Sequence, residues 1–228
     1  MNRPVAFRIP ALVLFRTGCV TSRYKGFMQT DYIRVLGRYI EVQARPVDKF
    51  GHQPRLVALT LEIGASLHYD RDVVLAAAWL HDLGVFPGHR PEDPDALAQW
   101  NHVAYACSRG PAILREAGFP EAKIAAVLSA IREHQPADEP TTLEATILRD
   151  ADILEQLGAI GILRIASKVG RDTRFQRFSD AVAVLRRNLE ELPPKIRLES
   201  ARCLAQPRIA VLQNFLRSVD DESGPNLF

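Results

Sequence analysis

The sequence predicts an all-α fold, a globular bundle of helices. From Met28 onward, apolar residues recur three and four positions apart, which is the spacing of one face of a helix. No segment alternates apolar and polar residues as a half-buried strand would. The 228 residues are 47% hydrophobic and 25% charged, a composition that suits one soluble globular domain with a sizeable core.

Three helices are expected before the first long loop. The first begins near Tyr32 and ends at Arg45, because the proline that follows disfavours a helical residue before it. The second covers about 51–68. The third runs from Val73 to Leu83 and contains the segment VVLAAAWL, which is apolar nearly all round. A helix without a polar face is a buried one, so we expect this helix at the centre of the bundle.

The remaining helices follow a loop over 84–94 that is rich in Gly, Pro and Asp. Their periodic segments cover about 95–117, 121–134, 141–169, 174–192 and 194–219. We therefore expect one domain over residues 28–220. A loose N-terminal arm over 1–27 would precede it, and a short tail over 221–228 would follow it.

Composition and charge argue against several classes of protein. The net charge is only +2, too small for the strongly basic face of a nucleic-acid platform. No apolar run approaches the roughly 20 residues of a membrane helix. Cys19, Cys107 and Cys203 lie far apart, without a CxxC pair, which argues against a disulfide framework. We expect a cytoplasmic protein that binds neither nucleic acid nor a membrane.

The informative residues are two histidines and two aspartates. His81 and Asp82 end the most apolar helix, where burying an imidazole and a carboxylate is costly unless they are paired or bound to a metal. His52 lies near the start of the preceding helix, and Asp152 lies in the stretch LRDADIL. This mixed nitrogen and oxygen set suits Mn, Fe, Co, Ni or Zn and differs from a cysteine-rich structural zinc site.

Three motifs carry a family resemblance. They are DKFGHQPRLVALTLEIG, LAAAWLHDLG and TLEATILRDADILEQLGAIGILR. The order His, His-Asp and a distant Asp resembles the HD-domain superfamily of metal-dependent phosphohydrolases. The third motif is the most specific and is similar to the DAD-x-L-[DE]-x-[LI]-GAIGI-x-R stretch of a branch of small bacterial HD hydrolases. The resemblance covers about Asp31 to Leu216.

The resemblance implies a metal site and a fold of the HD type. Its ligand positions match His52, His81, Asp82 and Asp152, and Asp150 would then be a capping or supporting residue. The cofactor implied is a divalent transition metal, with Mn favoured and Fe, Co, Ni, Zn or Mg as alternatives.

Further residues are candidates for catalysis. His102 and His134 fall near positions that carry histidines in many HD proteins, where they bind a second metal or contact the substrate phosphate. Asp82 could orient the attacking water while it binds the metal. Some nucleotidase members use a Glu three positions after the His-Asp pair, but here that position is Val85, so this part of their mechanism cannot be transferred.

Binding of a phosphate requires additional cations. Arg55 lies one helical turn after His52 and can face the same site, and an arginine binds phosphate through two donors. Lys168 and Arg171 belong to a second basic cluster and are further candidates, although such a cluster is more often a solvated face of a protein than a phosphate clamp.

The predicted function is hydrolysis of a phosphate ester or anhydride in a small molecule by a metal-activated water. By resemblance, the expected substrate is a nucleotide or deoxynucleotide. Two alternatives remain. A di-iron oxygenase of the HD type would need His102 and His134 as additional ligands, and a nucleotide-binding sensor would bind without turnover. A homodimer is compatible with the sequence but is not indicated by any motif.

Overall fold

The computed structural model describes residues 31–45, 51–172 and 174–227. It confirms the all-α prediction: within these ranges the backbone forms helices, and the only β-type pairing is an isolated bridge between Pro87 and Arg90. None of the helices in these ranges is long and apolar enough to cross a membrane. The arm predicted over residues 1–27 lies outside the described residues.

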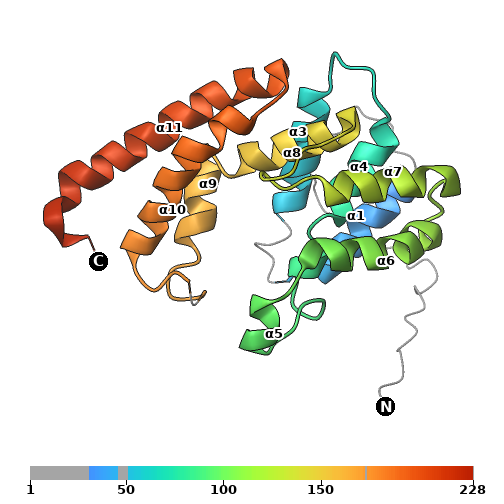
Figure 1. Ribbon diagram of the computed structural model, residues 1–228, viewed down its shortest axis with the longest axis horizontal. Helices are drawn as coiled ribbons and strands as arrows, with labels where there is room; N and C mark the ends of the chain where they lie inside the picture. Colours follow the sequence, from blue (N-terminus) through green and yellow to red (C-terminus); the bar gives the residue numbers. More distant parts are fainter. Residues whose placement is uncertain (1–30, 46–50, 173, 228) are drawn as a thin grey trace, which may run out of the picture.

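The helices follow one another along the chain, as Figure 1 shows. Their bounds are α1 Asp31–Gln43, α3 His52–Ile63, α4 Arg71–Leu80, α5 Pro94–Ala98, α6 His102–Glu116, α7 Glu121–Arg132, α8 Leu143–Glu155, α9 Gly158–Ala166, α10 Phe178–Glu191 and α11 Glu199–Ser223. Short 3-10 turns occupy Leu83–Val85, Pro193–Lys195 and Gly224–Asn226.

Helix α4 is the centre of the bundle, as its apolar sequence predicts. Every residue from Val73 to Leu80 is buried, and α1, α3, α7 and α8 all pack against this helix. Its first turn is capped by Asp70, whose carboxylate accepts hydrogen bonds from the backbone N–H groups of Asp72 and Val73. The hydrophobic effect therefore holds α4 in the interior, and its C-terminal end carries His81 and Asp82 into the protein.

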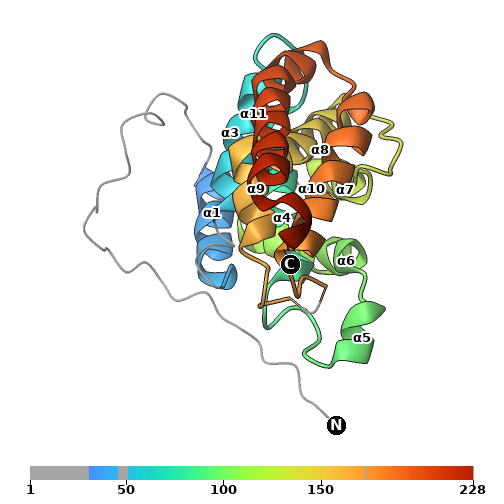
Figure 2. The same cartoon turned by 90° about the vertical axis from the view of Figure 1, so that its left-hand side faces the viewer.

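Helices α9, α10 and α11 form a second group beside this bundle. The three pack against one another, and α11 also contacts α8 and α3. Figure 1 shows this group to one side of α3 and α8, with the long α11 running along it, and Figure 2 shows α11 passing in front of α9. Helix α8 thus connects the central bundle, through its last turn, to α9.

Two of the expected helical segments are each split in two. The segment 95–117 forms α5 and α6, because Asn101 adopts an extended conformation and its side chain caps α6 by accepting from Ala104 N–H. The segment 141–169 forms α8 and α9, because the chain turns at Gly158, whose φ of +68° favours glycine. Helix α11 also continues to Ser223, beyond the predicted end near 219.

Candidate metal centre

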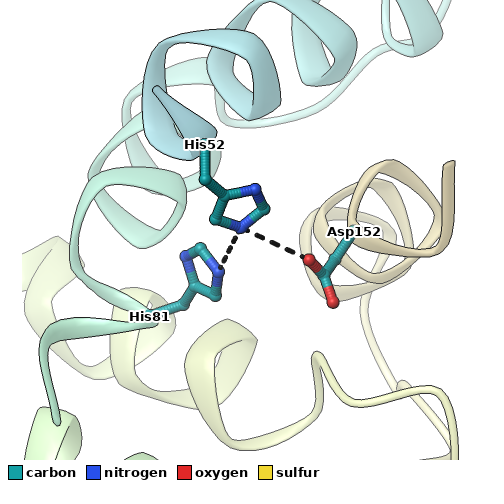
Figure 3. Close-up of side chains that lie close together, drawn as sticks. All are labelled: His52, His81 and Asp152. Atoms are coloured by element: carbon teal, nitrogen blue, oxygen red, sulfur yellow. Dashed lines mark hydrogen bonds and ion pairs between the residues drawn. The ribbon is translucent and has the colours of Figure 1, made fainter. Parts of the chain in front are cut away.

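Three helix ends meet at one point in the interior. His52 is the first residue of α3, His81 and Asp82 follow the last turn of α4, and Asp152 lies in the last turn of α8. These three helices pack against one another in pairs. Figure 3 shows the side chains of His52, His81 and Asp152 pointing toward one another from the three elements. Residues separated by up to 100 positions in the sequence thus form one cluster.

The inward-facing atoms are all of the kind that binds metals. The Nε2 atom of His52 lies 3.3 Å from Nε2 of His81 and 3.4 Å from Oδ1 of Asp152. Oδ2 of Asp82 lies 3.7 Å from Nε2 of His52 and 3.6 Å from Nε2 of His81. Two nitrogen lone pairs facing each other at such a distance are favourable only if a proton or a cation lies between them.

Backbone carbonyls orient two of the histidine rings. The Nδ1 atom of His81 lies 3.0 Å from the carbonyl oxygen of Ala78, and Nδ1 of His134 lies 2.7 Å from that of Ile131. A carbonyl oxygen can only accept, so each Nδ1 carries the proton and donates it. In a neutral ring with its proton on Nδ1, Nε2 keeps its lone pair, which is the form of histidine that binds a metal.

Burial sets the protonation state of the cluster. His81 is 1% exposed, and its burial lowers its pKa to about 4, so its imidazole is neutral near pH 7. Burial by itself would raise the pKa of Asp82, but His81, His52 and His134 around it hold that pKa below its ordinary value. A neutral imidazole beside an ionised carboxylate is the state that metal ligands require.

The described residues contain two groups of side chains that could hold a metal ion. One group is His52, His81 and Asp152, and the other is His81, Asp82 and His134. Within each group, one ligand atom from every residue lies within 4.8 Å of the others. Because His81 belongs to both groups, the donor set is continuous. Its nitrogen and oxygen chemistry fits a divalent transition metal.

The two further histidines of the sequence prediction lie at this cluster. The ring of His134 is buried, with its centroid 4.9 Å from that of His81. The side chain of His102 is 30% exposed, and its Nε2 lies 4.0 Å from Oδ1 of Asp82 and 3.5 Å from the amide nitrogen of Gln135. His102 therefore lies on the solvent-accessible side of Asp82. The roles predicted for both residues remain predictions.

The sequence analysis missed one buried acidic residue, Glu155. It ends α8, is 1% exposed, and its Oε2 lies 3.2 Å from Nδ1 of His52. Arg55 donates to the same carboxylate from Nε and Nη2, at 2.9–3.1 Å. Nη1 of Arg164, on α9, lies 3.1 Å from Nδ1 of His52 and 3.6 Å from Oε2 of Glu155. The acidic and arginine positions of the third motif could have pointed to this contact.

The other predicted residues have different surroundings. Asp150 is fully buried and accepts hydrogen bonds from the backbone N–H groups of Arg197 and Leu198, just before α11. Asp150 therefore fixes the segment that leads into α11, and the first turn of that helix has no side-chain cap. Lys168 and Arg171 lie in the turn after α9, and Nζ of Lys168 lies 5.3 Å from the centre of the Phe175 ring. Their predicted contact with phosphate is untested.

Comparison with known proteins adds a family and several related folds. The sequence profile of the HD domain matches residues 50–157, a range that contains all four predicted ligands. No curated protein matches the chain. The chain is similar to Bacillus subtilis YpgQ in complex with ADP, with a TM-score of 0.66 and 21% identity over 84% of this chain and 94% of YpgQ.

Two further solved structures share the fold. A predicted HD superfamily hydrolase from an uncultured Thermotogales bacterium has a TM-score of 0.57 and 24% identity, over 85% of this chain and 91% of that one. An HD-superfamily hydrolase from Bacillus thuringiensis has a TM-score of 0.62 and 18% identity, over 84% of this chain and 95% of that one. Identities this low show a common fold and leave the substrate open.

The fold, the cluster and the profile agree with one another. An HD domain implies a divalent metal, and the two groups of histidine and aspartate side chains supply donors for one. The chain therefore contains an HD domain over residues 50–157, and it shares the fold of proteins described as HD-superfamily hydrolases.

Proposed function

We propose that this protein hydrolyses a phosphate ester or anhydride in a small molecule, with a nucleotide or deoxynucleotide as substrate. The observation that carries the proposal is the convergence of His52, His81, Asp82 and Asp152, with the ring of His81 oriented by a backbone carbonyl and the carboxylate of Asp82 ionised. We assign the four residues as ligands of one divalent metal, preferably Mn, with Fe, Co, Ni, Zn or Mg as alternatives.

A metal at this centre would supply Lewis acidity, which makes water more acidic and polarises a phosphoryl oxygen. The remaining catalytic roles are assigned to the side chains around the metal. Asp82 directs Oδ2 toward His52 and His81 and Oδ1 toward His102, so it can hold the attacking water between the ligands and His102. The ligand role and the water-orienting role of Asp82 thus use different oxygens.

His102 is the proposed proton carrier. Burial lowers its pKa below the ordinary histidine value, so its imidazole is neutral near pH 7 and can accept a proton. As the water oxygen bonds to phosphorus, His102 would take the proton and deliver it to the leaving oxygen when the P–O bond breaks. His134, which is buried beside His81, is the proposed second contact to the phosphate.

The substrate class rests on charge and on one related structure. YpgQ was solved in complex with ADP. Here Arg55, Lys168 and Arg171 are the proposed phosphate-binding cations. Nε and Nη2 of Arg55 donate hydrogen bonds to Glu155, and the side chain of Arg55 is 37% exposed. Its remaining nitrogen, Nη1, could donate to a phosphate oxygen.

A metal-supplemented screen of nucleotides and deoxynucleotides tests the proposal. Phosphate and pyrophosphate are assayed separately, because the position of the broken bond is open. We expect turnover with at least one of the divalent metals, and Asp82→Ala should abolish both turnover and bound metal. An Asp82→Ala variant that remains active would show that the centre is assigned wrongly. Binding of nucleotide without product, with every metal, would favour a sensor.

A di-iron oxygenase is the second candidate, and one observation favours it. His134 joins His81 and Asp82 in a second group of ligand atoms, so the cluster could hold two ions. Purified protein with two irons, oxygen consumption and no phosphate release would support this function. Phosphate release with a single bound Mn or Co would exclude it.

A further inference from the structure

The carboxylate of Glu155 lies behind His52, on the side opposite the candidate ligands. Nε2 of His52 faces His81 and Asp152, whereas Nδ1 faces Oε2 of Glu155 at 3.2 Å. A buried carboxylate is stable only with charged or hydrogen-bonding partners. Arg55 supplies them, since its Nε and Nη2 both contact this carboxylate. Arg55 therefore keeps Glu155 ionised and its oxygen directed at His52.

Nδ1 of His52 has two competing neighbours. Glu155 Oε2 can only accept a hydrogen bond, and Arg164 Nη1, at 3.1 Å on the same nitrogen, can only donate one. If Nδ1 carries the proton, Glu155 accepts it and Nε2 offers a lone pair to a metal. If Nδ1 is unprotonated, Arg164 donates a hydrogen bond to it. The proton of the neutral ring is then on Nε2 and points into the cluster. The two neighbours thus favour opposite tautomers of His52.

We propose that Glu155 is a positioning residue that holds His52 in the Nδ1–H tautomer, while Arg164 favours the opposite tautomer. Arg55 anchors Glu155 in this arrangement. The inference rests on the proposed function in one respect, namely that the metal binds Nε2 of His52. Carboxylates that accept from a metal-bound histidine generally raise metal affinity, and their loss costs roughly ten- to a hundredfold.

Metal affinity of three single variants tests the proposal. In Glu155→Gln, the amide oxygen is drawn to the donors of Arg55, so the amide N–H₂ faces Nδ1 and favours the wrong tautomer. We expect affinity for Mn²⁺ or Co²⁺, measured by competition with a chromogenic chelator, to fall roughly tenfold or more. Arg164→Met should bind metal at least as tightly as wild type, because the competing donor and a positive charge are both removed.

A purely structural role predicts a different pattern. Loss of packing at the centre would weaken metal binding in both Glu155→Gln and Arg164→Met. Glu62→Gln, on the exposed face of the same helix as His52, is the matched control and should bind like wild type. Equal affinity of Glu155→Gln and wild type would overturn the proposal. Wild-type protein that binds no metal would instead contradict the proposed function.

The tautomer can also be observed directly, without any metal and with the unaltered chain. ¹⁵N-histidine NMR of the metal-free protein, above the ordinary histidine pKa of about 6.5, distinguishes the Nδ1–H form from the Nε2–H form. A His52→Asn variant identifies the signals of His52. We expect the Nδ1–H form to dominate in wild type and to decrease in Glu155→Gln. A dominant Nε2–H form in wild type would overturn the proposal even if Glu155→Gln fails to fold.

Discussion

The histidines of the centre owe their orientation to acceptors on the side away from it. His81 and His134 each donate from Nδ1 to the carbonyl oxygen three residues earlier, at the end of their own helices. These carbonyls are among those that a helix end leaves without an intrahelical partner. His52, at the beginning of a helix, has no such carbonyl and uses the side chain of Glu155. The same ring orientation is thus achieved by local backbone in two cases and by a distant residue in the third.

Gly84 offers a test of how closely His102 is held. A Cβ atom added at Gly84 would lie 2.7 Å from the carbonyl oxygen and 2.8 Å from Cα of His102. Gly84→Ala should therefore push the start of α6 away from Asp82. We expect turnover to fall at least tenfold and unfolding, followed in urea, to become easier by about 1–3 kcal/mol.

The matched control for this change is Gly110→Ala. The added Cβ would there meet only the end of the Leu128 side chain, at 3.0 Å, in the middle of α6. Because alanine is a better helix former than glycine, its stability should change by less than about 1 kcal/mol, and its turnover should not change. Normal activity of Gly84→Ala would show that His102 has no fixed place in the reaction.

Asp150 and Asp152 are two residues apart, but substitution of Asp150 should reduce stability, whereas substitution of Asp152 should abolish metal binding. Asp150→Ala leaves the backbone N–H groups of Arg197 and Leu198 without their acceptor, which should cost about 2 kcal/mol of the free energy of unfolding. Asp152→Ala should instead abolish metal binding, with little loss of stability in the metal-free protein. Urea denaturation and chelator competition on both variants measure the two effects. Loss of metal binding in Asp150→Ala, with only a loss of stability in Asp152→Ala, would show that the two roles are assigned the wrong way round.

At the scale of secondary-structure elements, the two ends of α4 have different roles. Its N-terminal end is fixed by Asp70, which accepts from two backbone N–H groups and forms an ion pair with Lys123 at 2.9 Å. Its C-terminal end presents His81 and Asp82. Since every residue from Val73 to Leu80 is buried, the helix can transmit little movement from one end to the other.

Removal of this cap should therefore reduce stability and leave the centre intact. We expect Asp70→Ala to lower the free energy of unfolding by about 1–2 kcal/mol, because a helix that packs against four others loses its cap. Metal affinity should stay that of wild type. Asp93→Ala removes the same kind of cap from α5, which has no buried residue, and should cost less. A large loss of metal affinity in Asp70→Ala would contradict the rigidity of α4.

At the scale of the whole molecule, the centre links α3, α4 and α8, three elements that would separate on unfolding. A metal that binds only the folded chain stabilises it by mass action, by about 2.7 kcal/mol at a hundred times its Kd. For a protein of this size, this should raise the melting temperature by roughly 5–10 °C. Thermal unfolding with metal and with EDTA measures the difference. Asp82→Ala should show none, and an equally small difference in wild type would contradict metal binding at this site.

The sequence was sufficient for the helical class, for the burial of α4 and for the candidate ligands that the structure brings together. These features depend on local periodicity and on a motif in which residue type and spacing carry the information. The ends of helices were harder to predict. Periodicity continues through Trp100 and Gly158, so it did not reveal that Asn101 caps a new helix or that Gly158 turns the chain.

The tertiary structure alone decided which polar groups meet. Glu155 lies 103 residues from His52 and 100 from Arg55, and its burial follows from the packing of α8 against α3. No pattern along the chain distinguishes an arginine directed at a substrate from one that neutralises a buried carboxylate. The role of such an arginine depends on which buried charge lies nearest to it, and the packing of the helices decides this. Local sequence thus identified the candidate ligands, and packing determined the contacts that orient them.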